Sequence, residues 1–154
     1  MLTVRDSIHI DAPPETVFAF LDEPARQVSF TPSLTTSSLI ERLPNGGSRA
    51  RYVFTIYGIN LEGEVRATDY DPPSRIVWAM TGDLTGTIRW YLDPEREGTR
   101  FTFAATYRVP GPSVLRPVVT PLLRRYNERE VRSLLQQLKA HVSSDFQKDI
   151  ERVK

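Results

Sequence analysis

Hydrophobic and polar residues alternate over most of the first two thirds of the chain. The alternation runs through residues 2–10 and again through residues 34–109. Turn residues interrupt the second stretch at 44–47, 57–58, 71–73, 82–83 and 93–98. A period of two is typical of β-strands that bury one face, and clusters of Pro, Gly, Asn and Asp separate consecutive strands. The pattern predicts one early strand and then six consecutive strands.

The two faces of these strands differ in character. One face collects arginines that we expect to point to water, namely Arg49, Arg51, Arg66, Arg75, Arg89, Arg100 and Arg108. The other face is strongly apolar, with Tyr52, Phe54, Ile56, Leu61, Val65, Ile76, Trp78, Met80, Ile88, Trp90, Phe101, Phe103 and Tyr107. A shift of one residue would move every side chain to the wrong face, so the recurrence of this separation along the chain favours a sheet with one buried face.

The hairpin around residues 57–58 has a register that the sequence predicts. A two-residue turn there places Arg51 opposite Glu64 on the polar face. It also places Tyr52 opposite Gly63 on the apolar face, where an aromatic ring can cover the bare backbone of a glycine.

The next hairpin cannot have a two-residue loop at residues 82–83. Such a loop would pair the inward Met80 with the outward Thr85. We therefore expect a three-residue loop that ends at Leu84, the alternative being that the faces of residues 76–80 are inverted.

Helical signals lie on either side of the strands. Pro and Glu after the first strand favour a short helix, and a second short helix is expected to run to about Phe30. After residue 109 the period becomes that of a long amphipathic helix. Its apolar stripe is Leu115, Val119, Leu122, Tyr126, Leu134, Leu138 and Val142. Pro117 and Pro121 leave two alternatives, a kinked helix from about Ser113 or a straight one from Thr120. The polar tail, residues 143–154, is expected to fray.

Composition narrows the function classes. The chain has 154 residues, no Cys and a formal net charge of +1. That length predicts a single domain over residues 1–154. The lack of Cys excludes disulfide frameworks, thiolate zinc sites and Cys nucleophiles, and the balanced charge argues against a nucleic-acid partner. With no apolar run long enough to span a membrane and no signal-peptide pattern at the start, we expect a cytoplasmic protein.

Several segments resemble a known family. The opening Ile8-His-Ile-Asp-Ala-Pro-Pro-Glu-Thr-Val-Phe and the late Glu97-Gly-Thr-Arg-Phe-Thr-Phe are similar to motifs of the START-like (SRPBCC) helix-grip superfamily, within its polyketide cyclase/dehydrase-like group. Asp71-Pro-Pro-Ser-Arg-Ile-Val-Trp and Leu134-Leu-Gln-Gln-Leu-Lys fit as well, so that the resemblance spans about residues 2–142. One departure is Phe30-Thr-Pro, where the group often has Trp before a proline.

The resemblance implies an α+β helix-grip fold, in which a curved antiparallel sheet of about seven strands wraps a long C-terminal helix. Its members bind lipids, sterols, quinones or polyketides between sheet and helix, and a minority catalyse cyclisation or dehydration without a cofactor. We therefore expect a small hydrophobic or amphipathic ligand and no cofactor. A fold alone does not assign a function. A cofactor-free cyclase or dehydratase is the first alternative, and an accessory protein acting at a membrane or protein surface is the second.

The candidate ligand-binding residues are the inward side chains of the strands and of the last helix. They are Tyr52, Phe54, Ile56, Trp78, Met80, Ile88, Trp90, Phe101, Phe103, Tyr107, Val119, Leu122, Tyr126 and Asn127. The strands present more apolar surface than one helical stripe readily covers, which favours an apolar pocket with few polar groups. Its polar members, Tyr52, Tyr107, Tyr126 and Asn127, either orient a ligand or satisfy one another within the core.

Other chemistries lack the residues that they need. His9 is expected on an outward strand position and His141 on the surface of the last helix, so neither a transition-metal site nor a Ser-His-acid triad is expected. Glu62 and Glu64 lie on the arginine-bearing face, as charge partners. Asp6 either faces the cavity or lies at a frayed strand end. An enzyme would need a titratable group inside the cavity, placed for proton transfer. The sequence offers only tyrosines and Asp6 for this role, and no catalytic residue is assigned.

Overall fold

The computed structural model describes residues 2–108 and 116–153, with side chains described throughout except at 116–121 and 153. In chain order the elements are β1 (Leu2–Ile10), α1 (Pro14–Leu21), α2 (Pro24–Phe30), β2 (Leu34–Arg42), β3 (Ser48–Ile56), β4 (Ile59–Asp71), β5 (Arg75–Gly82), β6 (Thr85–Glu95), β7 (Gly98–Arg108) and α3 (Arg116–Val153). This is the α+β helix-grip arrangement that the sequence predicts. None of the helices, over the described residues, is both long and apolar enough to cross a membrane.

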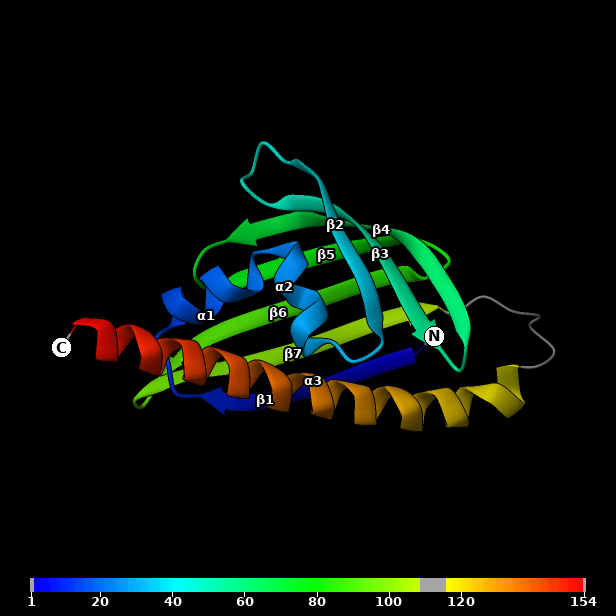
Figure 1. Cartoon of the computed structure of the whole chain (residues 1–154). Coiled ribbons are helices and arrows are strands. Elements are labelled where there is room, and N and C mark those ends of the chain that lie inside the picture. The colour runs from blue at the N-terminus through cyan, green and yellow to red at the C-terminus, as the bar shows by residue number, and fades with distance from the viewer. Residues whose placement is uncertain (1, 109–115, 154) are drawn as a thin grey trace.

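The strands form one antiparallel sheet in the order β1-β7-β6-β5-β4-β3-β2. Consecutive hairpins build six of its strands, and β1 closes the order beside β7. The sheet is strongly curved, and α1, α2 and α3 all lie on one side of it, with α3 running beside β1 (Figure 1). The apolar face of the sheet is thus the face that the helices cover.

Both predicted hairpin registers are confirmed. Tyr57 and Gly58 adopt φ angles of 50° and 76°, which a tight two-residue β-turn requires, and Arg51 pairs with Glu64. In the next hairpin Met80 pairs with Gly86, and this register leaves a three-residue loop that ends at Leu84. The faces expected for residues 76–80 are therefore correct.

The arginine face is confirmed as solvent-facing, but its ion pairs run diagonally. None of the seven outward arginines is buried. Glu64 accepts two hydrogen bonds from Arg49, at 2.9 and 3.2 Å, rather than from Arg51 directly opposite. Arg51 instead lies 3.8 Å from Glu62. Long side chains reach diagonal neighbours on a strand pair, so the carboxylates expected as charge partners do have that role.

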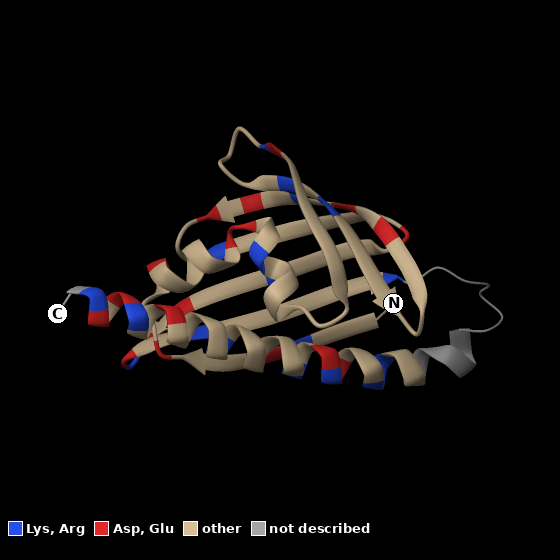
Figure 2. Ribbon diagram, in the orientation of Figure 1, with Lys and Arg blue, Asp and Glu red and all other residues tan. Residues whose placement is uncertain are grey.

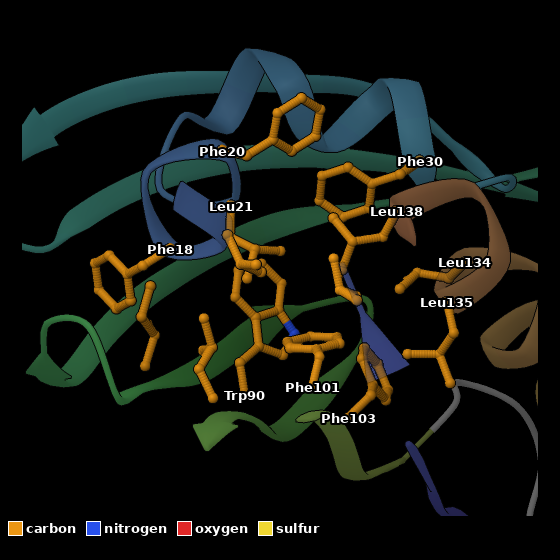
Figure 3. Close-up of a cluster of buried hydrophobic side chains, with 14 of the residues drawn as sticks. Phe18, Phe20, Leu21, Phe30, Trp90, Phe101, Phe103, Leu134, Leu135 and Leu138 are labelled. Atoms are coloured by element: carbon orange, nitrogen blue, oxygen red, sulfur yellow. The ribbon is translucent and has the colours of Figure 1, made fainter. Parts of the chain in front are cut away.

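The main hydrophobic core lies where α1, α2 and the middle of α3 meet the apolar face of the sheet. Phe18, Phe20, Leu21 and Phe30 come from the short helices, Leu134, Leu135 and Leu138 from α3, and Trp90, Phe101 and Phe103 from the strands (Figure 3). Phe30 is almost fully buried, so the aromatic residue at the end of α2 is retained without an indole N–H. A second, smaller cluster of buried residues contains Leu34, Tyr52, Leu61, Met80 and Leu84.

The long helix does not start at Thr120, because its described part runs from Arg116 to Val153. The start expected near Ser113 lies outside the described residues, and the end of the helix differs from the expectation. Pro117 and Pro121 both fall within the described helix. The polar tail does not fray in the structure but continues the helix to Val153. Phe146 packs against the main core and gives this last part of the helix an apolar contact.

Leu122 does not lie on the buried stripe of this helix, contrary to the sequence prediction. Its side chain is 60% exposed, whereas Leu138 is fully buried. At 3.6 residues per turn the two positions point in directions about 160° apart. The stripe drawn from the sequence therefore drifted around the helix, and the buried stripe is Val131, Leu134, Leu135, Leu138 and Val142.

Candidate functional site

A cavity of about 120 Å³ lies between the apolar face of the sheet and α3. The segment from the end of α2 to the start of β2 forms its remaining wall. The described residues that line it are Gln27, Thr31, Pro32, Ser33, Leu34, Ser37, Tyr52, Phe54, Ile56, Val65, Trp78, Met80, Leu84, Ile88, Trp90, Phe103, Ala105, Tyr107, Tyr126, Asn127, Glu130, Val131 and Leu134. The lining is mostly apolar, as is usual for small-molecule sites.

Most of the predicted ligand-binding side chains line this cavity. They are Tyr52, Phe54, Ile56, Trp78, Met80, Ile88, Trp90, Phe103, Tyr107, Tyr126 and Asn127. Two of the predicted residues lie elsewhere. Phe101 has no exposed surface and packs in the main core, and Leu122 points away to solvent. The side chain of Val119 lies outside the described residues. The strand positions were predicted more accurately because a period of two tolerates no drift over a few residues.

Two tryptophans form the apolar wall of the cavity. Trp78 and Trp90 lie on neighbouring strands, with ring centroids 5.4 Å apart and ring planes at 71°, an edge-to-face arrangement that aromatic pairs favour. Both rings are almost fully buried. Neither indole N–H has a hydrogen-bond acceptor among the described residues. Each indole N–H is therefore a buried donor without a partner among the described residues, beside the apolar surface of its ring.

The hydroxyl of Tyr52 is already hydrogen-bonded within the protein. It accepts a hydrogen bond from the Leu84 N–H at 3.2 Å, and it lies 3.1 Å from the carbonyl oxygen of Thr81 and 3.2 Å from that of Leu84. Burial is the main cause that raises the pKa of Tyr52. Of the two alternatives left open for this residue, the structure supports a tyrosine that satisfies the core.

The other predicted polar residues gather at one end of the cavity. Tyr126, on α3, shares a hydrogen bond with Ser33 from the loop after α2, and its ring packs against Tyr57 with centroids 5.0 Å apart. Tyr107, on β7, belongs to the same group: burial first, and then the nearby Tyr126, raise its pKa above the ordinary value, while a hydrogen bond with Asn127 opposes this rise. These side chains form a polar end on an otherwise apolar cavity.

Glu130 is one of the cavity residues that the sequence pattern did not predict. It lies on α3 one turn after Tyr126, lines the cavity, and raises the pKa of Tyr126 through a hydrogen bond and through its charge. In the sequence its charge matched a solvated helix face. Its spacing from Asn127 and Leu134, three and four residues, is that of one helix face and was the available signal.

The wall formed by the α2–β2 segment was also not predicted. Gln27 and the run Thr31-Pro-Ser-Leu line the cavity. These residues follow neither a helical nor a strand period, and therefore no hydrophobic pattern identifies them. Ser33 brings a hydroxyl group to the polar end, where it shares a hydrogen bond with Tyr126.

The remaining titratable candidates lie outside the cavity. His141 is exposed, as expected, with its ring stacked 6.3 Å from Phe20. Asp6 neither faces the cavity nor lies at a frayed end, since β1 continues to Leu2 and its carboxylate accepts a hydrogen bond from Arg132 Nε at 3.0 Å. Among the described residues, no three His, Asp or Glu side chains are grouped as a metal site requires.

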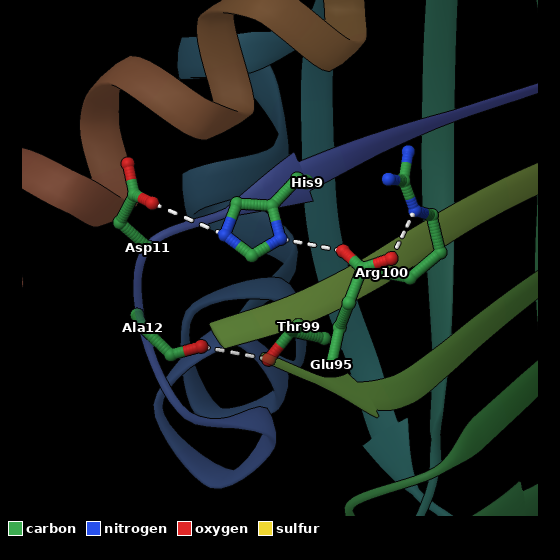
Figure 4. A network of polar contacts seen from close by, with 6 residues as sticks. All are labelled: His9, Asp11, Ala12, Glu95, Thr99 and Arg100. Carbon is green, nitrogen blue, oxygen red and sulfur yellow. Dashed lines mark hydrogen bonds and ion pairs between the residues drawn. The ribbon is translucent and has the colours of Figure 1, made fainter. Parts of the chain in front are cut away.

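His9 is bound in a network rather than freely solvated. Its Nδ1 contacts Glu95 Oε2 and its Nε2 lies 3.1 Å from Asp11 Oδ1, while Arg100 Nε donates to Glu95 at 3.0 Å (Figure 4). His9, followed by Arg100, holds the pKa of Glu95 below its ordinary value. The network joins the end of β1 to the turn between β6 and β7, so its role is structural.

Residues 1–143 match a family model described as polyketide cyclase / dehydrase and lipid transport. No curated protein matches the chain.

Solved structures with a similar fold cover nearly the whole chain. The protein TTHA0849 from Thermus thermophilus aligns with a TM-score of 0.82 at 24% identity, over 93% of this chain and 98% of that chain. The Zhui aromatase/cyclase from a Streptomyces species aligns at 0.77 and 14%, over 91% and 92%. A START superfamily protein from Mycobacterium smegmatis aligns at 0.71 and 15%, over 92% and 97%. At these identities the likeness concerns the fold alone.

Proposed function

This chain belongs to the polyketide cyclase/dehydrase and lipid transport family, and on that premise we propose that it binds a small hydrophobic or amphipathic molecule, of lipid, quinone or polyketide type, in the cavity between the sheet and α3. The observation that carries the proposal is the mostly apolar lining with polar groups at one end. Such a lining holds a ligand by its apolar surface and orients it by a few hydrogen bonds.

The size of the cavity bears on the ligand. A closed apolar cavity of about 150 Å³ is known to accept one benzene ring. At about 120 Å³ the cavity offers comparable room, so part of a larger ligand would extend beyond it, or the walls would move apart. Tyr126 and its hydrogen-bonded partner Ser33 belong to different elements, and their separation would widen the cavity at its polar end.

A cyclase or dehydratase is the second candidate, and Glu130 is the observation that favours it. Proton transfer needs a titratable group within reach of the ligand, and the cavity is lined by this carboxylate together with the phenols of Tyr107 and Tyr126. A carrier needs no such group. The same carboxylate also serves a carrier as a hydrogen-bond acceptor, and we therefore place binding first.

An accessory role at an anionic membrane has less support. Basic and acidic residues alternate along α3 (Figure 2), with Glu128 between the exposed Arg125 and Arg129. A helix that lies on such a membrane needs a predominantly basic polar face beside an apolar one. The charges on α3 do not form that face.

Extraction of a bound molecule tests the proposal most directly. Native mass spectrometry of the protein purified from its own host is expected to show a mass above that of the chain, and extraction should release a small hydrophobic molecule. The released molecule, added back at a hundredfold excess over its dissociation constant, should stabilise the fold by ~2.7 kcal/mol and change the fluorescence of Trp78 and Trp90.

The same experiment separates the candidates. A carrier returns the molecule unchanged, whereas an enzyme converts it and loses turnover in a Glu130→Gln variant. If no molecule is extracted, and a panel of fatty acids, sterols, quinones and aromatic polyketides neither stabilises the protein nor changes its fluorescence, the binding proposal is wrong.

A further inference from the structure

The described residues that line the cavity carry a negative charge and no positive charge. Among the described residues that line it there is one carboxylate, Glu130, and no Lys, Arg or His. The arginines of the strands lie on the opposite face of the sheet, and Arg132 of α3 is engaged with Asp6. A ligand with a carboxylate would therefore be buried next to a like charge and without a counter-ion. Burial of an unpaired charge is strongly unfavourable.

The phenol groups of Tyr107 and Tyr126 lie in this environment, and their pKa values reflect it. Burial and the neighbouring Glu130 both raise the pKa of Tyr107 and of Tyr126, which means that the polar end disfavours the anionic form of a hydroxyl group. The same physical causes act on a hydroxyl or carboxyl group that a ligand brings to this place. The site favours a ligand group that keeps its proton.

The polar end also offers a hydrogen-bond acceptor with free capacity. An ionised carboxylate has about four acceptor positions. Tyr126 uses one of these positions, in the hydrogen bond with Glu130 that contributes to the raised pKa of Tyr126. A hydroxyl group donating to a carboxylate forms a charge-assisted hydrogen bond, which is stronger than one between neutral groups. Asn127, next to Tyr107, adds an amide that can donate to the same oxygen of the ligand.

The geometry points to a specific ligand class: we propose that the cavity binds an uncharged, ring-containing molecule whose hydroxyl group donates to Glu130 while its ring lies against Trp78 and Trp90, and that the cavity rejects carboxylates. This inference rests on the proposed binding function and deepens it. It excludes free fatty acids, although they belong to the general class of hydrophobic ligands.

Three probes of nearly equal shape test the inference by isothermal titration calorimetry at pH 7. The first is 4-propylphenol, which has a donor. The second is 4-propylanisole, in which a methyl group replaces the donated proton, and the third is the anion 4-propylbenzoate. We expect the phenol to bind at least about tenfold more tightly than either of the other two, in line with a hydrogen bond to a charged group.

Two charge-neutralising variants of α3 locate the effect. Glu130→Gln keeps the shape of the side chain and removes the charge, and it should reduce the preference for the phenol over the benzoate by about tenfold. Glu128→Gln makes the same chemical change on an exposed position of the same helix, and it should leave the preference unchanged. Thermal unfolding of both variants checks that each is folded.

The outcomes distinguish this inference from the binding function. If the benzoate or the anisole binds the wild-type protein as tightly as the phenol, the ligand class is wrong while binding itself stands. Equal effects of the two variants would also overturn it, since the preference would then arise from overall charge. If none of the probes binds and extraction yields no ligand, both the inference and the proposed function fail.

Discussion

The hydroxyl group of Tyr52 on β3 reaches across β4 to the backbone of Leu84 and accepts a hydrogen bond from the Leu84 N–H at 3.2 Å. The ring can take this path because Gly63, its partner on β4, has no side chain. A Cβ built on Gly63 would stand 2.6 Å from the Tyr52 hydroxyl oxygen and 2.0 Å from the Thr81 carbonyl oxygen. One phenol thus ties the loop between β5 and β6 to a strand two positions away in the sheet.

Tyr52→Phe should destabilise the protein by ~1–3 kcal/mol, because the buried Leu84 N–H loses its partner. Urea denaturation measures the change in the free energy of unfolding. Tyr91→Phe is the matched control, since Tyr91 is on the outer face and has no side-chain hydrogen bond among the described residues; it should change stability by less than about 0.5 kcal/mol. Equal effects of the two substitutions would contradict this role of Tyr52.

Phe101 and Phe103 differ by two positions on β7 and share a face, yet only Phe103 lines the cavity. Phe101→Ala should cost ~3–5 kcal/mol, the usual loss for a phenylalanine in a packed core. Phe103→Ala should cost less than that range, because one side of its ring already adjoins open space. Equal losses in denaturation experiments would mean that the space beside Phe103 is filled in solution.

Asn127→Leu is expected to weaken binding of 4-propylphenol by about fivefold, or ~1 kcal/mol, for the hydrogen bond lost, and Tyr126→Phe is expected to weaken it by less. Asn127 acts directly on the ligand oxygen, whereas Tyr126 positions Glu130 and is expected to have the smaller effect. Calorimetric titration gives the dissociation constants, with Tyr91→Phe as the control. Unchanged affinity in both variants would show that the polar end does not hold the ligand.

Glu95 makes part of the stability dependent on pH. Its pKa in the folded protein lies below the ordinary 4.5, chiefly because of His9 and then Arg100. A carboxyl group with a lowered pKa stabilises the fold above its unfolded pKa, and the contribution disappears as the pH falls through the folded value. Glu95→Gln should therefore be less stable than wild type at pH 7 and approach it at pH 3.

Urea denaturation at the two pH values provides that comparison. Glu97→Gln serves as its control, because Glu97 is exposed in the same turn and has no ion pair among the described residues. A constant difference between Glu95→Gln and wild type across both pH values would show that the ionisation of Glu95 is not responsible.

The strands were predicted in detail because two independent signals, the alternation of side chains and the chemistry of the turns, agree with each other. Alternation fixed the face of Trp78 and Trp90, and turn chemistry fixed the pairing of Arg51 with Glu64. A strand side chain has only two directions, and a wrong register would have buried arginines. The inward strand residues of the cavity followed directly from this.

The helix side of the cavity was harder to predict. A helical residue can point in any direction, and a stripe drawn over many turns accumulates error, as Leu122 shows. Glu130 was not among the predicted cavity residues, and its charge gave no reason to expect it there, because charged residues are rarely buried. Ser33 lies in a segment without periodicity, and its contact with Tyr126 joins residues 93 positions apart. Only the tertiary structure brings Ser33, Tyr126 and Glu130 together at one end of the cavity.

In α3, the polar residues that line the cavity precede the residues that anchor the helix in the core, and this order bears on how proteins of this fold diversify. The residues that anchor the helix in the main core begin at Val131, and two of them, Val131 and Leu134, also line the cavity, whereas Tyr126, Asn127 and Glu130 line the cavity without belonging to the core. On the proposed binding function, substitutions at these three positions should alter the recognition of the ligand but leave the anchor intact, so that selection can change specificity with little loss of foldability. A combinatorial library restricted to this one turn of helix is therefore an economical route to altered ligand preference.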